Sequence, residues 1–134
     1  MIDSAEKVPV ISIVDDDPSI RSAMEDLVMS HGFEVQSFDS ADQFLSSTER
    51  HATSCIVSDI QMPGTSGIEM KRHLLAQNDH TPIIFITAYP QPETKKNAIE
   101  AGAICFLVKP FDGRTLINCI ERALRGDRGD HEHA

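Results

Sequence analysis

Three consecutive carboxylates, Asp15, Asp16 and Asp17, directly follow the apolar run that ends at Val14. Clustered carboxylates raise one another's pKa unless a cation neutralises them. A divalent ion is the natural solution, and an oxygen-only ligand set suits Mg²⁺, which usually takes one or two carboxylates and keeps several waters. The stretch therefore indicates a Mg²⁺ site, with Mn²⁺ as a substitute ion.

Three other apolar runs also end in polar residues, namely Asp59, Thr87 and Lys109. If these strand ends share one rim, a carboxylate, a hydroxyl and an ammonium converge on the acidic stretch. A carboxylate flanked by Mg²⁺ and a lysine is ready to react with a phosphoryl donor. Both cations screen its charge and stabilise the equatorial oxygens of the transferring group.

The apolar runs that should position these residues are short and rich in Val, Ile and Phe. They are continuous rather than alternating, which is typical of strands in a parallel sheet covered on both faces. A weaker run, 33–38, alternates and predicts an edge strand. The four continuous runs are 8–14, 55–57, 83–86 and 104–108.

Helical patterns separate these strands. Ser40 and Asp112 are expected N-caps, prolines occupy two of the first turns, and Gly32 and Gly102 suit left-handed positions after helix ends. The predicted helices are 18–31, 40–51, 66–77, 92–101 and 112–124.

Strict alternation of five strands with five helices predicts an α/β fold, a doubly wound five-stranded parallel sheet flanked by five helices. In such sheets, ligands bind at the carboxyl ends of the strands, near a topological switch point. This rule places the acidic stretch, Asp59, Thr87 and Lys109 at one rim.

Length and composition fit one domain, expected over residues 1–126, followed by a polar, disordered tail over 127–134. The chain has 134 residues, of which 40% are hydrophobic and 25% charged, and its formal net charge is -9. Nucleic-acid binding needs a basic face, so the acidic balance argues against it and favours a protein or a cation as partner. No apolar run approaches the length of a membrane span, so no membrane partner is expected.

The cysteines are three in number and two of them, Cys55 and Cys105, lie inside apolar runs. A free thiol in such a run behaves as a small hydrophobe. No signal peptide is recognisable at the N-terminus. These features predict a reduced, cytoplasmic location.

Four motifs occur in order along the chain: Asp15-Asp16, "SDIQMPGTSG" around Asp59, "FITA" with Thr87, and "FLVKPF" with Lys109. Here the chain closely resembles the receiver domain of bacterial two-component response regulators, over about residues 8–124. The resemblance implies the flavodoxin-like version of the fold, with strand order 2-1-3-4-5.

The resemblance also assigns roles at the metal site. It implies that Asp59 is the phosphorylated residue and that Asp15 and Asp16 bind Mg²⁺ directly or through water. Asp59 and the backbone carbonyl of Gln61 would complete the protein ligands. Gln61 and Tyr89 occupy positions that tune phosphate lifetime in the family.

The remaining implied roles concern the switch. Thr87 would bond a phosphate oxygen, Lys109 would pair with the phosphate, and Phe106 would turn inward as the surface of the fourth helix, fifth strand and fifth helix changes. The Lys109-Pro110 bond is usually cis in this family. Such a protein is not an enzyme beyond its own phosphorylation and dephosphorylation.

The partners implied by the resemblance are a sensor histidine kinase or phosphotransfer protein upstream. Downstream we expect a protein target or an output domain absent from this chain, and a phosphorylation-dependent homodimer is a further expectation.

Two alternatives stay open at this point. A haloacid-dehalogenase-like phosphohydrolase also has Asp-x-Asp after its first strand, with Asp15 as nucleophile and Asp17 as general acid. Against it, the chain lacks a late Asp pair after the lysine strand and an inserted cap, and Asp17 is expected to be a helix-start charge. A phosphorylation-independent scaffold or small-molecule binder is the second alternative.

Overall fold

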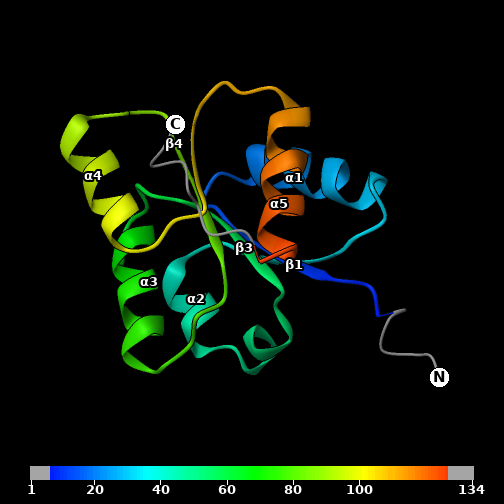
Figure 1. Ribbon diagram of the computed structural model, residues 1–134, viewed down its shortest axis with the longest axis horizontal. Coiled ribbons are helices and arrows are strands. Elements are labelled where there is room, and N and C mark those ends of the chain that lie inside the picture. Colours follow the sequence, from blue (N-terminus) through cyan, green and yellow to red (C-terminus); the bar gives the residue numbers. More distant parts are fainter. Residues whose placement is uncertain (1–6, 127–134) are drawn as a thin grey trace.

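The computed structural model describes residues 7–126, which form one parallel sheet with helices on both faces (Figure 1). The strand order is β2-β1-β3-β4-β5, which confirms the predicted doubly wound topology. The predicted tail, 127–134, lies outside the described residues. The strands are β1 (Val10–Val14), β2 (Glu34–Phe38), β3 (Cys55–Asp59), β4 (Ile83–Thr87) and β5 (Cys105–Val108).

The helices divide into two layers. Helices α1 and α5 pack on one face of the sheet, and α2, α3 and α4 pack on the other (Figure 1). Their bounds are α1 (Pro18–Ser30), α2 (Ala41–Ser46), α3 (Gly67–Ala76), α4 (Pro92–Glu100) and α5 (Gly113–Leu124), with a short 3-10 helix, η2 (Thr48–Ala52).

Helix starts follow the predicted capping chemistry. The side chain of Ser40 accepts a hydrogen bond from the backbone N–H of Gln43, and that of Asp112 accepts one from Arg114. Each cap satisfies a backbone donor that the first helical turn leaves without a partner. Gly32 follows the end of α1 with φ of 91°, a left-handed conformation that glycine adopts without steric cost.

The predicted helix over 40–51 is wrong in one respect. It ends at Ser46, and Ser47 adopts an extended conformation with ψ of 136°. The Ser47 side chain accepts a hydrogen bond from the backbone N–H of Glu49 and so caps the separate helix η2. A serine side chain competes locally for backbone donors, and here that competition interrupts the helix.

Burial along the sheet matches the predicted patterns except at β5. Strands β3 and β4 are buried throughout, and β1 is buried except at its first residue. Strand β2 lies at one edge, as its alternation predicted. Strand β5 forms the other edge, and Val108 there is exposed.

The register of the sheet sets the four strand ends nearly level. Val14 pairs with Ser58, so Asp15 follows β1 at the level of Asp59. Asp59 in turn pairs with Ile86, which immediately precedes Thr87. The predicted rim of polar residues is therefore a consequence of strand register.

The three cysteines are free and buried, as expected for small apolar side chains. Within residues 7–126, no helix combines the length and the apolar character that crossing a membrane requires.

Candidate functional site

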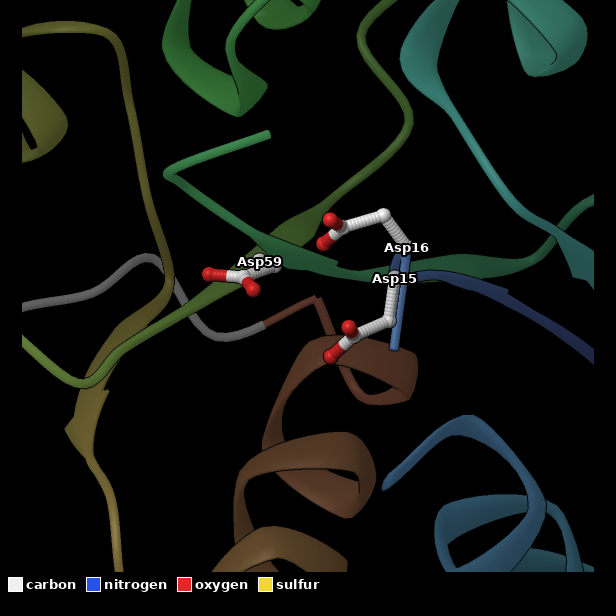
Figure 2. A group of neighbouring side chains, drawn as sticks. All are labelled: Asp15, Asp16 and Asp59. Atoms are coloured by element: carbon white, nitrogen blue, oxygen red, sulfur yellow. The ribbon is translucent and has the colours of Figure 1, made fainter. Parts of the chain in front are cut away.

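Three carboxylates gather at the carboxyl edge of the sheet. Asp15 and Asp16 follow β1, Asp59 ends β3, and one ligand oxygen from each lies within 4.8 Å of the others. Figure 2 shows Asp15 and Asp16 extending from the end of β1 toward the side on which Asp59 lies, at the end of the neighbouring strand β3. Asp15 is 0% exposed and Asp59 is 7% exposed, whereas Asp16 is exposed to solvent.

Asp15 is held by hydrogen bonds from the following loop and from α1. Its Oδ1 accepts a 2.9 Å hydrogen bond from the backbone N–H of Asp17, and Arg21 Nη1 donates a 2.7 Å bond to its backbone carbonyl. Its Oδ2 has no hydrogen-bond partner, and within residues 7–126 it is the only buried side-chain nitrogen or oxygen in that state. Burying an oxygen without a hydrogen-bond donor costs folding free energy, so Asp15 Oδ2 is suited to binding a cation.

Lys109 supplies the positive charge of the site. Its Nζ lies 3.4 Å from Asp59 Oδ2 and 3.7 Å from Asp15 Oδ2. The backbone N–H of Lys109 donates to the carbonyl of Thr87 at 2.9 Å, which extends the pairing of β4 with β5 beyond Val108. The Lys109-Pro110 peptide bond is cis, as the resemblance implied.

One ammonium does not offset the burial of these carboxylates. Burial raises the pKa of Asp15 above its ordinary value, although the backbone N–H of Asp17 and the charge of Lys109 act to lower it. The pKa of Asp59 is likewise raised by burial, with Lys109 opposing and Asp15 reinforcing the increase. The site therefore favours an additional cation.

The donor set fits Mg²⁺. It consists of oxygens alone, it contains one buried carboxylate oxygen without a hydrogen bond, and its exposed member leaves a side open to water. These are the properties of sites that bind Mg²⁺ through a few carboxylates. The participation of the Gln61 carbonyl stays a prediction.

Thr87 faces Gln61 across the site. The Thr87 hydroxyl is fully buried and donates a 2.6 Å hydrogen bond to Gln61 Oε1, while accepting a 3.0 Å bond from the backbone N–H of Tyr89. The expected roles of Gln61 were a backbone ligand and a position that tunes phosphate lifetime, and this side-chain contact with Thr87 was not predicted. The position of Gln61 two residues after Asp59 was the available signal.

Phe106 is the second residue of the predicted switch, after Thr87, and lies in β5. It is half-buried on β5 and packs against the core between the sheet and the helices α2 to α4. Nearby on α4 and β5, Ile99 and Val108 are 41% and 40% exposed. The face formed by α4, β5 and α5 thus presents apolar side chains to solvent.

Asp17 is not part of the carboxylate group. Its side chain accepts hydrogen bonds from the backbone N–H groups of Ser19 and Ile20, so it is the N-cap of α1. This confirms the expected helix-start role. It also disfavours the phosphohydrolase alternative, which requires Asp17 as a general acid.

Two supporting contacts were not foreseen. Gly67, the first residue of α3, donates its N–H to the carbonyl of Ile60 at 3.0 Å and lies against the backbone of Asp59. Thr65 Oγ1 donates a 2.8 Å hydrogen bond to Asp42 Oδ1, and this bond connects the loop after β3 to α2. The glycine at a helix start was the only sequence signal for the first contact.

Comparison with known proteins agrees with this geometry. The model of the response regulator receiver domain family matches residues 11–121. Nodulation protein W of Bradyrhizobium diazoefficiens is 38% identical over 123 residues, covering 92% of this chain and 54% of that protein. The chain spans about half the length of the curated relatives it matches.

Solved structures show the same likeness. The response regulator StyR superposes with a TM-score of 0.83 at 42% identity, covering 90% of this chain and 61% of that one. The chemotaxis protein CheY4 of Vibrio cholerae superposes with a TM-score of 0.80 at 30% identity, covering 88% of this chain and 100% of that one. The fold, the acidic rim formed by Asp15, Asp16 and Asp59, and these matches agree with one another. The chain belongs to the response regulator receiver domain family of two-component systems.

Proposed function

We propose that Asp59 accepts a phosphoryl group in a Mg²⁺-dependent reaction, from a sensor histidine kinase or a phosphotransfer protein. The observation that carries this proposal is the position of the Asp59 carboxylate. It lies 3.4 Å from Lys109 Nζ and within 4.8 Å of the carboxylates of Asp15 and Asp16, at the open edge of the sheet. Asp15 has the same neighbours, with Lys109 Nζ 3.7 Å from its Oδ2, but Asp15 is 0% exposed whereas Asp59 is 7% exposed.

Phosphoryl transfer to Asp59 requires no general acid or base from the chain. An oxygen of the Asp59 carboxylate attacks phosphorus of a phosphohistidine, the P–O bond forms, and the P–N bond breaks. The imidazole nitrogen keeps the electron pair of that bond, and Asp59 becomes an acyl phosphate. Lys109, already beside Asp59 Oδ2, is placed to attract the oxygens of the arriving group.

Asp15, Asp16 and Asp59, with the carbonyl of Gln61, would bind the Mg²⁺ ion. When bound, the ion supplies charge stabilisation for the transferring phosphoryl oxygens. Asp15 contributes a buried oxygen whose position is fixed by the Asp17 N–H and by Arg21 on its own carbonyl. Moving its carboxylate would break the hydrogen bond from the Asp17 N–H.

Thr87 and Phe106 would convert phosphorylation into a surface change. The Thr87 hydroxyl would leave Gln61 to donate to a phosphate oxygen, and Phe106 on the adjacent strand would turn inward. The face of α4, β5 and α5, with exposed Ile99 and Val108, would then be remodelled. Its partner is a downstream protein or an output domain, and homodimerisation upon phosphorylation would bury the same apolar side chains.

Under this proposal the chain is a switch and not an enzyme for external substrates, with a cytoplasmic location. A phosphohydrolase that uses Asp15 as nucleophile is disfavoured. Asp15 is 0% exposed, and Asp17 caps α1.

The test is to treat the protein with acetyl phosphate and Mg²⁺, trap the acyl phosphate with borohydride, and map it after trypsin digestion. Trypsin separates Asp59, in peptide 51–71, from Asp15, in peptide 8–21. We expect the adduct at Asp59, its loss in Asp59→Asn, and its loss when EDTA replaces Mg²⁺. An adduct on peptide 8–21 would overturn the proposal in favour of the phosphohydrolase.

A further inference from the structure

Two cysteines line one cavity on the face formed by α4, β5 and α5. Cys105 belongs to β5 and Cys119 to α5, and both contribute to a cavity of about 620 Å³ that Phe106, Lys95 and Arg122 also line. Cys105 is 8% exposed and Cys119 is 6% exposed, so each is nearly covered but borders open space. Small solutes can therefore reach the pair through the cavity.

The sulfur of Cys105 lies beside a cation. Arg122 Nη1 donates a hydrogen bond to this sulfur at 3.6 Å, and Cys119 lines the same cavity. Within residues 7–126 the guanidinium of Arg122 forms no ion pair with a carboxylate. Its charge is therefore available to stabilise a thiolate at Cys105.

These contacts give the two thiols different reactivity. Interaction with Cys119 and the charge of Arg122 lower the pKa of Cys105 despite burial, whereas interaction with Cys105 and burial raise the pKa of Cys119. A thiolate is the nucleophilic form of cysteine, and a neighbouring cation increases its population. Cys105 is thus the better nucleophile, and Cys119 retains its proton.

Cys55 provides an internal contrast. It is 0% exposed within β3, and burial raises its pKa to about 12. Desolvated structural thiols of this kind are inert. The chain therefore contains one thiol pair with reactive features and one thiol without them.

We propose that Cys105 and Cys119 are an oxidisable thiol pair, in which a hydroperoxide oxidises Cys105 and Cys119 then closes a disulfide between β5 and α5. In the first step, the Cys105 sulfur attacks the terminal oxygen of the hydroperoxide and the O–O bond breaks. Cys105 becomes a sulfenic acid, and the other oxygen leaves with the Cys105 proton as an alcohol or, from hydrogen peroxide, as water. In the second step, the Cys119 sulfur attacks the Cys105 sulfur. The sulfenic oxygen leaves as water with the Cys119 proton. With hydrogen peroxide the sum is two thiols plus one peroxide giving one disulfide and two waters.

The site is separate from the acidic rim. Cys105 lies at the start of β5, whereas Lys109 follows the other end of that strand. Oxidation would link β5 to α5 covalently beside Phe106 and would restrict movement of this face. Oxidation of Cys105 and Cys119 does not depend on phosphorylation of Asp59, so each of the two reactions can be tested without the other.

The test uses the full chain exposed to hydrogen peroxide, then unfolded, alkylated and digested with trypsin. Cleavage after Lys96, Arg114 and Arg122 leaves Cys105 in peptide 97–114 and Cys119 in peptide 115–122, while Cys55 lies in peptide 51–71. We expect peptides 97–114 and 115–122 to be joined by a disulfide that dithiothreitol reverses, with Cys55 still alkylated. Absence of the joined peptides, or equal oxidation of Cys55, would overturn the proposal.

Variants assign the roles of the two sulfurs. Cys119→Ser should leave a sulfenic acid on Cys105 that dimedone traps, and Cys105→Ser should leave Cys119 unmodified. The reverse pattern would overturn the assignment of Cys105 as the first sulfur oxidised. Arg122→Gln should slow disulfide formation severalfold in the otherwise unchanged protein, because it removes the cation at Cys105. An unchanged rate would overturn the role of Arg122.

Discussion

The hydroxyl of Thr87 donates a 2.6 Å hydrogen bond to Oε1 of Gln61, two residues after Asp59. Because the Thr87 oxygen also accepts from the backbone N–H of Tyr89, its only proton is directed at Gln61. A hydroxyl has one proton to donate, so Thr87 must leave Gln61 before it can donate to a phosphoryl oxygen. The contact therefore opposes the movement proposed for Thr87.

Replacing Gln61 by methionine should ease that movement. Gln61→Met preserves the length of the side chain but removes the acceptor, so Thr87 no longer loses a hydrogen bond of about 0.5–1.5 kcal/mol when it moves. We expect the affinity for beryllofluoride, a phosphoryl mimic, to rise about two- to tenfold in Mg²⁺. Isothermal titration calorimetry measures the change.

Gln77→Met is the matched control, because Gln77 also accepts a side-chain hydrogen bond, from Arg50, but lies outside the rim. Its beryllofluoride affinity should equal that of the unmodified protein. Weaker binding by Gln61→Met would show that Gln61 assists the bound state instead of competing with it.

The acidic rim should be a source of instability when no metal is bound. Asp15 and Asp59 are both buried, and burial raises the pKa of each. Asp15→Asn or Asp59→Asn should therefore raise the free energy of unfolding in EDTA by about 1 kcal/mol, as measured by urea denaturation. Asp26→Asn removes an exposed aspartate of α1 and should change it little.

Adding Mg²⁺ should reverse the order of stability, so that the unmodified protein becomes more stable than Asp15→Asn and Asp59→Asn. A ligand that binds only the folded state stabilises it in proportion to the logarithm of its concentration. The unmodified protein should gain stability as Mg²⁺ is added, whereas both rim variants should gain less. An equal gain in Asp59→Asn would place the metal elsewhere.

The predictability of this site from sequence follows from the regularity of the sheet. Asp15, Asp59, Thr87 and Lys109 each follow or end an apolar run, and parallel register alone sets such ends level. The contact between Gln61 and Thr87 depends on the path of an irregular loop. A repeating pattern of apolar residues in the sequence carries no information about such a path. The interruption at Ser47 was missed for a related reason. It results from one side chain competing with the helix for a backbone donor.

Lys109 should stabilise the metal-free protein through the two buried carboxylates it contacts. Lys109→Met leaves Asp59 and Asp15 without the ammonium that lies 3.4 and 3.7 Å away. We expect a loss of about 1–3 kcal/mol in unfolding free energy in EDTA, because removing one partner leaves an uncompensated buried charge. In an Asp15→Asn background the loss should be smaller. Strict additivity in this double-mutant cycle would show that the pair does not interact.

Asp79 should give the protein a defined acid dependence. Burial acts to raise its pKa, but hydrogen bonds from the Thr81 N–H and hydroxyl, together with Arg50, hold that pKa below the ordinary 3.8. A lowered folded-state pKa means that the stabilisation is present above 3.8 and is lost as the pH falls through the folded-state value.

Asp79→Asn tests this dependence by urea denaturation across the acidic range. At neutral pH the variant should be less stable by about 1–2 kcal/mol, because the hydrogen bonds lose their charged acceptor. The difference from the unmodified protein should shrink below pH 3.8, where the carboxyl begins to protonate in the unfolded chain. A difference that stays constant with pH would assign the loss to packing and not to charge.

Gly67 sets the distance between α3 and the phosphoacceptor strand. A Cβ added at this position would overlap the carbonyl oxygen of Asp59 and would lie 3.0 Å from Ser58 Oγ. The overlap is with backbone, which cannot rotate away, so Gly67→Ala must displace either α3 or the end of β3. We expect a loss of about 1–3 kcal/mol in unfolding free energy.

Gly113→Ala is the matched control, since Gly113 is likewise the first residue of a helix and follows an aspartate N-cap. Its added Cβ would lie 3.2 Å from Leu27 Cδ2, a flexible side-chain end that can move. Stability should change by less than about 1 kcal/mol. Because Gly67 lies against Asp59 itself, Gly67→Ala should also slow phosphorylation by acetyl phosphate, and Gly113→Ala should not. Equal phosphorylation rates in the two variants would show that the end of β3 tolerates displacement, so the position of Asp59 would be set by Lys109 and the rim carboxylates rather than by the approach of α3.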